Sequence, residues 1–308
     1  AGVDIDMMTG IYSEHLCNLV RDGKVPEELV DEAVYRILAL KNKLGLFENP
    51  YKDADEENEK EVFLCKEYRE LAREAARKSF VLLKNEEVLT LKKWLKVSYI
   101  GPYVYKGYMM GSWSIVGDAK DVTTLKEAVL EREEGKTAMF GAGCALLGGE
   151  VKLEGFMESV EEEPSAEECA AMMEEAVKLA GEADTVVLAL GEHRLQSGEA
   201  TSNATIQIPK IQMELFRRVC EVNEKVAVVL FSGRPLDIRE ISRKAKAVLE
   251  VWMPGTEGAR AIVDVLSGDY NPSGKLPMSF PYCVGQVPVH YTEYSTGRPH
   301  VEGKAMDG

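Results

Sequence analysis

Beyond residue 62 the sequence alternates between short apolar runs and segments with helical periodicity, and this alternation restricts the fold more than any other feature. The apolar runs are rich in β-branched side chains and end near a glycine or a proline. Because such runs separated by helices are typical of a parallel sheet covered on both faces, we predict an α/β fold with a mostly parallel sheet sandwiched by helices. The predicted strands are 97–100, 137–140, 185–190, 226–231 and 247–251, with helices at 165–181, 210–222 and 256–267. Before them, a further helical segment leads into an apolar run at 80–83.

A separate helix precedes this region, and an acidic segment divides the two. From Pro26 to Gly45 apolar side chains recur every three or four residues, which predicts a helix with one apolar face. Residues 51–62 are charged and nearly free of large apolar side chains, so they cannot bury enough surface to offset their ordering entropy. We therefore predict a surface linker there, and a solvated acidic insertion at 150–168.

The charge and the cysteine pattern argue against several classes of partner. Acidic residues number 52 against 37 basic ones, for a net charge of -15, so we predict no binding to nucleic acid or to a membrane surface. No stretch approaches the length of apolar sequence that spans a bilayer. The six cysteines are scattered and form no Cys-x-x-Cys motif, and the sequence contains no His-Glu-x-x-His, so we expect no metal site. Scattered single thiols also favour a reducing compartment, so we expect a cytoplasmic location.

Ligands of parallel sheets bind beyond the carboxyl ends of the strands, so the loops there are the first place to look for a site. His193 and Glu199 follow the predicted strand 185–190. A glutamate in such a loop can act as a general acid if partial burial raises its pKa, although a solvated side chain is the alternative. Trp113 lies in a Gly/Ser-flanked loop, where an indole either stacks on a sugar or folds back as a lid.

Two further motifs carry less information. The glycine-rich run 141–149 suggests a dinucleotide fingerprint, but its third glycine falls seven residues after the first and no helix opening is predicted next, which favours a flexible loop. Arg234 follows the predicted strand 226–231, where it could pair with an acidic loop or contact a ligand.

Several longer motifs occur in a fixed order along the chain. The longest is GDYNPSGKLPMSF at 268–280, and shorter ones stand at 81–85, 111–114, 232–236 and 254–258. Together they resemble glycoside hydrolase family 3, the β-glucosidase and β-xylosidase family. AGVD at the start of the chain, with KLGLF after the first helix, is similar to the end of that family's first domain.

This resemblance implies a domain order. Members of the family have a (β/α)₈ barrel followed by an α/β sandwich, with the active site between them. Residues 1–50 would be the terminal elements of the barrel, 51–62 the linker, 63–285 the sandwich domain with the acid/base loop, and 286–308 a C-terminal tail. The chain lacks an initiator methionine and a leader-like start, so we expect it to begin inside a structure.

The resemblance also implies an activity and its residues. Family members are retaining β-glycosidases, so the expected substrates are small oligosaccharides and aryl or alkyl β-glycosides, with no cofactor and no metal. Glu199, in SGEATS, matches the family's general acid/base, and we predict Trp113, Ser112 and His193 as substrate-binding residues. The aspartate nucleophile and the glycone contacts would lie on a barrel upstream of Ala1, so the chain alone is expected to be inactive.

One departure and two alternatives stand beside this interpretation. Relatives commonly carry Arg and Asp where this sequence has Asn203 and Thr205, so the loop or the substrate can differ here. A non-catalytic carbohydrate-binding or interaction module on the same fold is one alternative. The other is a nucleotide site at the point where the strand order reverses, which the spacing of the glycine-rich run disfavours.

Overall fold

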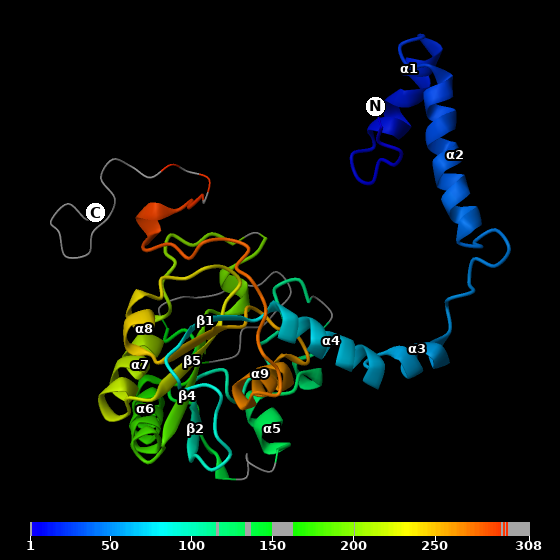
Figure 1. Cartoon of the computed structure of the whole chain (residues 1–308). Helices are drawn as coiled ribbons and strands as arrows, with labels where there is room; N and C mark the ends of the chain where they lie inside the picture. The colour runs from blue at the N-terminus through cyan, green and yellow to red at the C-terminus, as the bar shows by residue number, and fades with distance from the viewer. Residues whose placement is uncertain are drawn as a thin grey trace. The chain divides into compact units, whose positions relative to one another are not determined.

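The structure is a computed structural model, and it forms two compact units, Ala1–Cys65 and Lys66–Gly308 (Figure 1). Among the residues it describes, no helix is both long and apolar enough to cross a membrane. The described residues are 2–114, 117–132, 137–149, 163–199, 201–290, 292 and 294.

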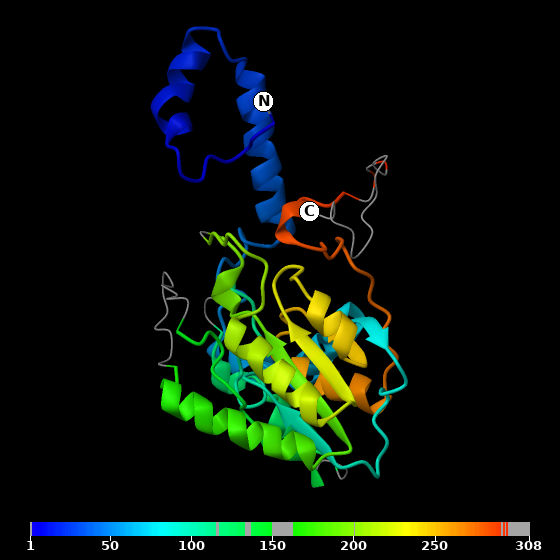
Figure 2. The ribbon, with the colours of Figure 1, turned by 90° about the vertical axis from the view of Figure 1, so that its left-hand side faces the viewer.

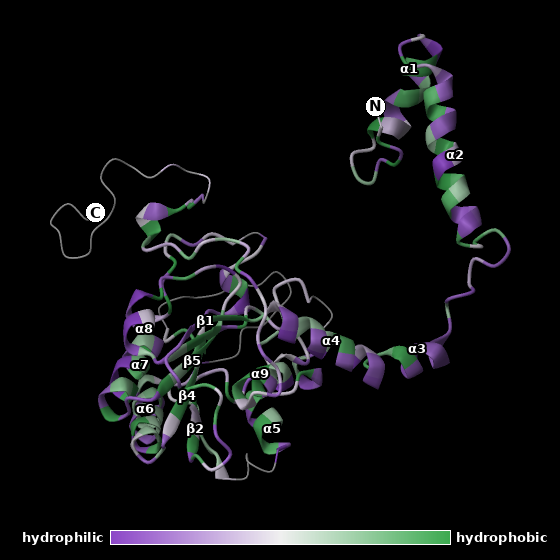
Figure 3. Ribbon diagram, in the orientation of Figure 1, coloured by the Kyte–Doolittle hydropathy of each residue, from purple (hydrophilic) through white to green (hydrophobic). Residues whose placement is uncertain are grey.

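The first unit is helical and exposes its apolar side chains. Its longest helix begins directly after Pro26, which confirms the predicted helix, and apolar and polar residues alternate along it (Figure 3). Leu29 and Leu38 on this helix are 51% and 45% exposed, and none of the described residues 2–65 is buried. This part of the chain therefore has no core of its own. Its elements are a π-helix (Tyr12–Leu16), α1 (Cys17–Arg21), α2 (Glu27–Lys43) and α3 (Glu56–Val62).

The acidic segment predicted as a surface linker contains a helix, α3. Asp55 caps its first turn, because the carboxylate accepts hydrogen bonds from the backbone N–H groups of Glu57 at 3.0 Å and Asn58 at 3.3 Å. Every residue of α3 is exposed, so local capping and not burial orders this short helix. The composition of the segment does not distinguish Asp55 from the other acidic residues around it.

The described residues of the second unit form one six-stranded sheet in the order β1-β6-β5-β4-β2-β3. All neighbouring strands are parallel except β1, which runs antiparallel to β6. The predicted α/β fold with a mostly parallel sheet is therefore confirmed, and each of the five strands from β2 to β6 lies within two residues of its predicted bounds. The strands are β1 (Val81–Asn85), β2 (Val97–Ile100), β3 (Met139–Gly141), β4 (Thr185–Gly191), β5 (Val226–Phe231) and β6 (Ala247–Glu250).

Helices cover both faces of the sheet (Figures 1 and 2). The side chains of the central strand β4 alternate between the two resulting cores: Val187 and Ala189 face one, and Val186, Leu188 and Leu190 face the other. One layer holds α4 (Lys66–Ser79), α5 (Leu125–Leu130) and α9 (Gly258–Ser267), and the other holds α6 (Ala166–Gly181), α7 (Lys210–Val222) and α8 (Arg239–Lys244).

Two predicted segments fall largely outside the described residues. Of the acidic insertion at 150–168, residues 150–162 lie outside them, and Ser165 caps α6 with a capping box. Of the tail at 286–308, only 286–290, 292 and 294 are described. Three 3-10 helices complete the described elements: η2 (Ala119–Asp121), η4 (Arg194–Gln196) and η5 (Val284–Gln286).

Candidate active site

Since β2, β4, β5 and β6 are parallel, the loops that follow them leave the same edge of the sheet, which we call the carboxyl edge. Three of these loops carry the residues singled out in the sequence. They are the β2 loop at 101–114, the β4 loop at 192–199 and the β5 turn at 232–235.

The β4 loop and the β2 loop contact each other at two points. Gly198 has a φ of +132°, and a Cβ added to it would lie 2.5 Å from Ser112 Oγ, so the Ser112 side chain approaches the backbone closely only because residue 198 is glycine. Four residues earlier in the loop, the Arg194 guanidinium donates to Ser114 Oγ at 3.0 Å. These contacts bring Glu199 and the Ser112–Trp113 pair to the same part of the carboxyl edge.

The β4 loop also rests on the β5 turn. A Cβ added to Gly233 would overlap Ser197 Oγ, so the serine side chain lies against the glycine backbone. Glu192 at the start of the loop is fully buried and accepts a hydrogen bond from Gly233 N at 3.2 Å. Its other carboxylate oxygen pairs with Arg234 Nε at 3.1 Å, so Arg234 adopts the pairing with an acidic loop that the sequence left open.

Glu199 and Trp113 face solvent on these braced loops. Among the described residues, no hydrogen bond or ion pair holds the Glu199 carboxylate. Trp113 is 67% exposed and does not fold back as a lid, and Ser112 beside it is half-buried. A free carboxyl group close to an exposed indole can exchange a proton with a ligand that stacks on the ring.

His193, predicted as a substrate-binding residue, has a different environment. Its side chain is buried, its Nδ1 accepts from Leu195 N at 3.2 Å at the start of η4, and it meets the Tyr108 ring edge-on. Burial lowers the pKa of this imidazole below its usual value, which favours the neutral form. It faces a cavity of about 110 Å³ that is also lined by Cys144 and Glu163, whereas Glu199 does not line that cavity.

Two residues that hold the end of β4 were not singled out in the sequence. Gln212 on α7 is fully buried and binds both backbone groups of Gly191, accepting from N at 2.9 Å and donating to O at 2.8 Å. The hydroxyl of Tyr103, also fully buried, donates to the carbonyl of Glu192. A glutamine on the apolar side of helix 210–222 was the available signal for the first, and nothing in the sequence distinguished the second.

Glu250, at the end of β6, is a third residue of the carboxyl edge that was not singled out in the sequence. It is fully buried, its Oε1 accepts from Ser232 Oγ at 3.2 Å and from Trp252 N at 2.8 Å, and its Oε2 has no partner in the described part of the chain. The signal was a single charged side chain inside an apolar run, because a charge on a central strand rarely stays buried without a reason.

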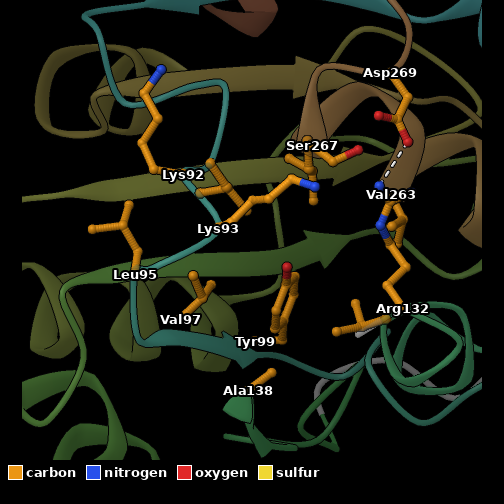
Figure 4. A pocket seen from close by; sticks show the side chains of 13 residues that line it. Lys92, Lys93, Leu95, Val97, Tyr99, Arg132, Ala138, Val263, Ser267 and Asp269 are labelled. Carbon is orange, nitrogen blue, oxygen red and sulfur yellow. Dashed lines mark ion pairs between the residues drawn. The ribbon is translucent and has the colours of Figure 1, made fainter. Parts of the chain in front are cut away.

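A second cavity, of about 80 Å³, lies away from the predicted site residues. It reaches from the start of β2 to the end of α9, and its lining includes Tyr99 and an ion pair between Arg132 and Asp269 at 2.7 Å (Figure 4). None of Glu199, Trp113, Ser112 and His193 lines it. The described residues contain no group of three or more His, Cys, Asp or Glu side chains that could hold a metal ion.

Comparisons with known proteins place this geometry in a family. Residues 80–306 match the family model for the glycosyl hydrolase family 3 C-terminal domain. A periplasmic β-glucosidase of Salmonella typhimurium is 39% identical over 97% of this chain, and a β-xylosidase of Formosa agariphila is 33% identical over 95%. The chain spans 40% of the length of each of these two relatives.

A solved structure agrees over the whole chain. The β-glucosidase of Listeria innocua in complex with isofagomine superposes with a TM-score of 0.79 and 38% identity, covering 100% of this chain and 40% of that one. The family model covers well over half of the chain, and the relatives match in sequence and in fold. The chain therefore belongs to glycosyl hydrolase family 3, and its second unit is the C-terminal α/β domain of that family.

Proposed function

We propose that this chain supplies the acid/base side of the active site of a retaining β-glycosidase, in the first instance a β-glucosidase. The observation that carries the proposal is the interlocked pair of loops at the carboxyl edge. They expose the Glu199 carboxyl group, without a partner among the described residues, beside the exposed Trp113. The relatives named above, two β-glucosidases and a β-xylosidase, support the same class of reaction.

In this proposal Glu199 acts in both steps of the reaction. It first protonates the oxygen of the leaving group while a carboxylate nucleophile attacks the sugar, and it then removes a proton from the water that cleaves the glycosyl-enzyme. Proton transfer of this kind contributes about 10² to 10⁴ in rate. A bound sugar would cover the exposed side chain and exclude water from the carboxyl group during the proton transfer.

Trp113 and Ser112 form the wall for the leaving group. The exposed indole offers an apolar surface to one face of a sugar or an aryl ring, and the Ser112 hydroxyl is half-buried beside the glutamate loop. His193 is buried beneath the same loop, so its part in substrate binding would be indirect, through the η4 turn that it caps. The substrates in view are small β-linked oligosaccharides and aryl or alkyl β-glycosides.

The nucleophile would come from a (β/α)₈ barrel. In retaining enzymes the two carboxyl groups lie about 5 Å apart. The first unit would supply the terminal elements of that barrel, and the remaining elements would pack on it, where Leu29 and Leu38 of α2 expose apolar surface. The fact that the chain spans 40% of its relatives supports a division of the active site between this chain and such a domain.

The test uses a chimera in which this chain replaces the matching 40% of the Listeria innocua β-glucosidase. The substrate is 2,4-dinitrophenyl β-glucoside, whose leaving group needs no proton. In the Glu199→Ala variant the second step should become slow, and added azide should restore turnover with β-glucosyl azide as the product, because azide needs no general base. The isolated chain should hydrolyse nothing.

Glu182→Ala is the matched control, since Glu182 is also exposed but lies after α6 at the opposite edge of the sheet. It should leave turnover unchanged. Normal turnover of the Glu199→Ala chimera, with no azide product, would remove Glu199 from the mechanism. Sugar binding by the isolated chain, together with such a result, would favour the carbohydrate-binding module instead.

A further inference from the structure

The β5 turn lies between two buried carboxyl groups that end the neighbouring strands. Strand β5 stands between β4 and β6 in the sheet. From the β4 side, Glu192 accepts from Gly233 N at 3.2 Å and pairs with Arg234 at 3.1 Å. From the β6 side, Glu250 accepts from Ser232 Oγ at 3.2 Å. Three successive residues of the turn are thus held by two glutamates from different strands.

The turn transmits this bracing to the acid/base loop. Ser197 lies against the backbone of Gly233, with no space between them for a Cβ, and Ser197 is two residues before Glu199. Any displacement of the turn therefore displaces the base of the loop that carries the proposed acid/base. Misplacement of a reacting group by about 1 Å costs on the order of 10² in rate.

The two glutamates differ in their partners. Glu192 has an arginine partner, whereas Glu250 has none among the described residues and keeps one carboxyl oxygen without any hydrogen bond. Burial raises the pKa of Glu250 to about 8, and the nearby negative charge of Glu192 raises it in the same direction. At neutral pH Glu192 and Arg234 therefore form an ion pair, whereas the carboxyl group of Glu250 is neutral. The charged groups that face Glu250 are Glu192 from the end of β4 and, through it, Arg234 from the turn.

We propose that Glu192 and Glu250 are positioning residues for the acid/base loop, holding the Ser232–Arg234 turn from both sides. This inference depends on the function proposed above for Glu199. Ionisation of Glu250 places a second negative charge beside Glu192, repels it and loosens the turn. The position of Ser197, and with it the rate of the reaction, then depends on the proton of Glu250.

The first test measures the intact chain directly, by amide hydrogen exchange of residues 192–199 and 232–234 at pH 7 and pH 9. After correction for the intrinsic pH dependence, the wild type should exchange about tenfold faster at pH 9, because the loosened turn opens more often. Glu250→Gln, which has the shape of the neutral acid, should show no such increase. Glu192→Gln should exchange faster already at pH 7.

The second test uses the chimera and 2,4-dinitrophenyl β-glucoside, so that the acid form of Glu199 does not shape the pH profile. The wild-type kcat/KM should fall above about pH 8, and Glu250→Gln should lose that fall. Glu192→Gln and Glu250→Leu should lower kcat on the order of 10²-fold with little change in KM. Glu182→Ala is again the control, because Glu182 is exposed at the opposite edge of the sheet.

Each result separates the two proposals. If Glu250→Gln keeps the wild-type pH profile and the wild-type exchange rates, Glu250 is not a positioning residue. If Glu192→Gln alters exchange and kcat no more than Glu182→Ala does, the same holds for Glu192. Either outcome leaves the azide result for Glu199 untouched, whereas failure of that result removes the proposed function and not the bracing of the turn.

Discussion

The buried carboxylates of the α4–α9 layer and the carboxyl groups of the carboxyl edge differ in their ion-pair and hydrogen-bond partners. In the layer, Asp264 is 2% exposed and accepts from Arg73 at 2.8 Å and from Arg77 at 3.3 Å. Glu257, also 2% exposed, pairs with Arg69 and, at 2.6 Å, with Arg260. Each of these carboxylates has two arginine partners on helices that it ties together.

At the carboxyl edge the carboxyl groups have at most one arginine partner among the described residues. Glu192 has one arginine, Glu250 has a serine hydroxyl, a backbone N–H and an oxygen without a partner, and Glu199 has none among the described residues. A fully paired buried carboxylate contributes to packing and keeps its charge. An unpaired one can exchange a proton, which is a property of reactive groups. We therefore predict that the paired acids of the α4–α9 layer are structural and that the unpaired acids of the carboxyl edge are functional.

The largest expected effect follows the removal of a paired carboxylate from the α4–α9 layer. Asp264→Asn leaves Arg73 and Arg77 without their buried partner, so the free energy of unfolding of the second unit should fall by about 3 to 5 kcal/mol. Urea denaturation followed by tryptophan fluorescence checks this, because all three tryptophans lie in that unit. Glu70→Gln, at an exposed partner of Arg77, should change it by less than about 0.5 kcal/mol. Equal costs for both variants would contradict the comparison.

The second prediction concerns Glu250 and pH. Glu250 has its ordinary pKa of 4.5 in the unfolded chain and a pKa of about 8 in the folded state. Between these two pH values the folded state therefore binds more protons than the unfolded chain. Its free energy of unfolding should therefore fall as the pH rises from 5 to 8, by about 3 kcal/mol from this group. Glu250→Gln should remove that part of the slope, as measured by urea denaturation across the range. Asp264→Asn should keep it, and superimposable slopes for wild type and Glu250→Gln would show that Glu250 does not titrate there.

The layered fold could be predicted because it is recorded in local patterns. The apolar run at 226–231 and the helical periodicity at 210–222 each specify one element, and both appear with the predicted bounds. The antiparallel pairing of β1 with β6 joins segments far apart in the chain, and no local pattern encodes it. The helix α3 depended on one capping residue, Asp55, among many acidic ones.

The candidate site could be predicted only in part. Motifs identified Glu199 and Trp113, and the strand pattern located their loops at one edge of the sheet. The bracing of those loops depends on tertiary contacts such as Glu192 with Arg234, and the burial of His193 beneath the loop results from the same packing. Such contacts connect residues that no spacing in the sequence relates.

The third prediction tests how closely the two loops at the carboxyl edge approach. Gly198→Ala combines a strained φ of +132° with a Cβ 2.5 Å from Ser112 Oγ, so the stability of the second unit should fall by about 1 to 2 kcal/mol. Adding Ser112→Gly should recover part of the loss, since it removes the clash and not the strain. Gly181→Ala is the control, because a Cβ there meets no other atom within 4 Å. Urea denaturation should rank the variants in this order, and a Gly198→Ala variant as stable as Gly181→Ala would contradict the close approach.

The smallest expected change in stability accompanies a clear change in binding. Trp113 is 67% exposed, so Trp113→Ala should alter the free energy of unfolding by less than about 0.5 kcal/mol. In the chimera it should raise the KM for a disaccharide such as laminaribiose about tenfold, while inhibition by glucose, which lacks a leaving-group sugar, stays unchanged. Trp94→Ala, at a tryptophan that is 80% exposed away from the carboxyl edge, should leave both constants unchanged. An equal KM for the two variants would mean that Trp113 does not bind the leaving-group sugar. The prediction of function at the carboxyl edge would then depend on the carboxyl groups only.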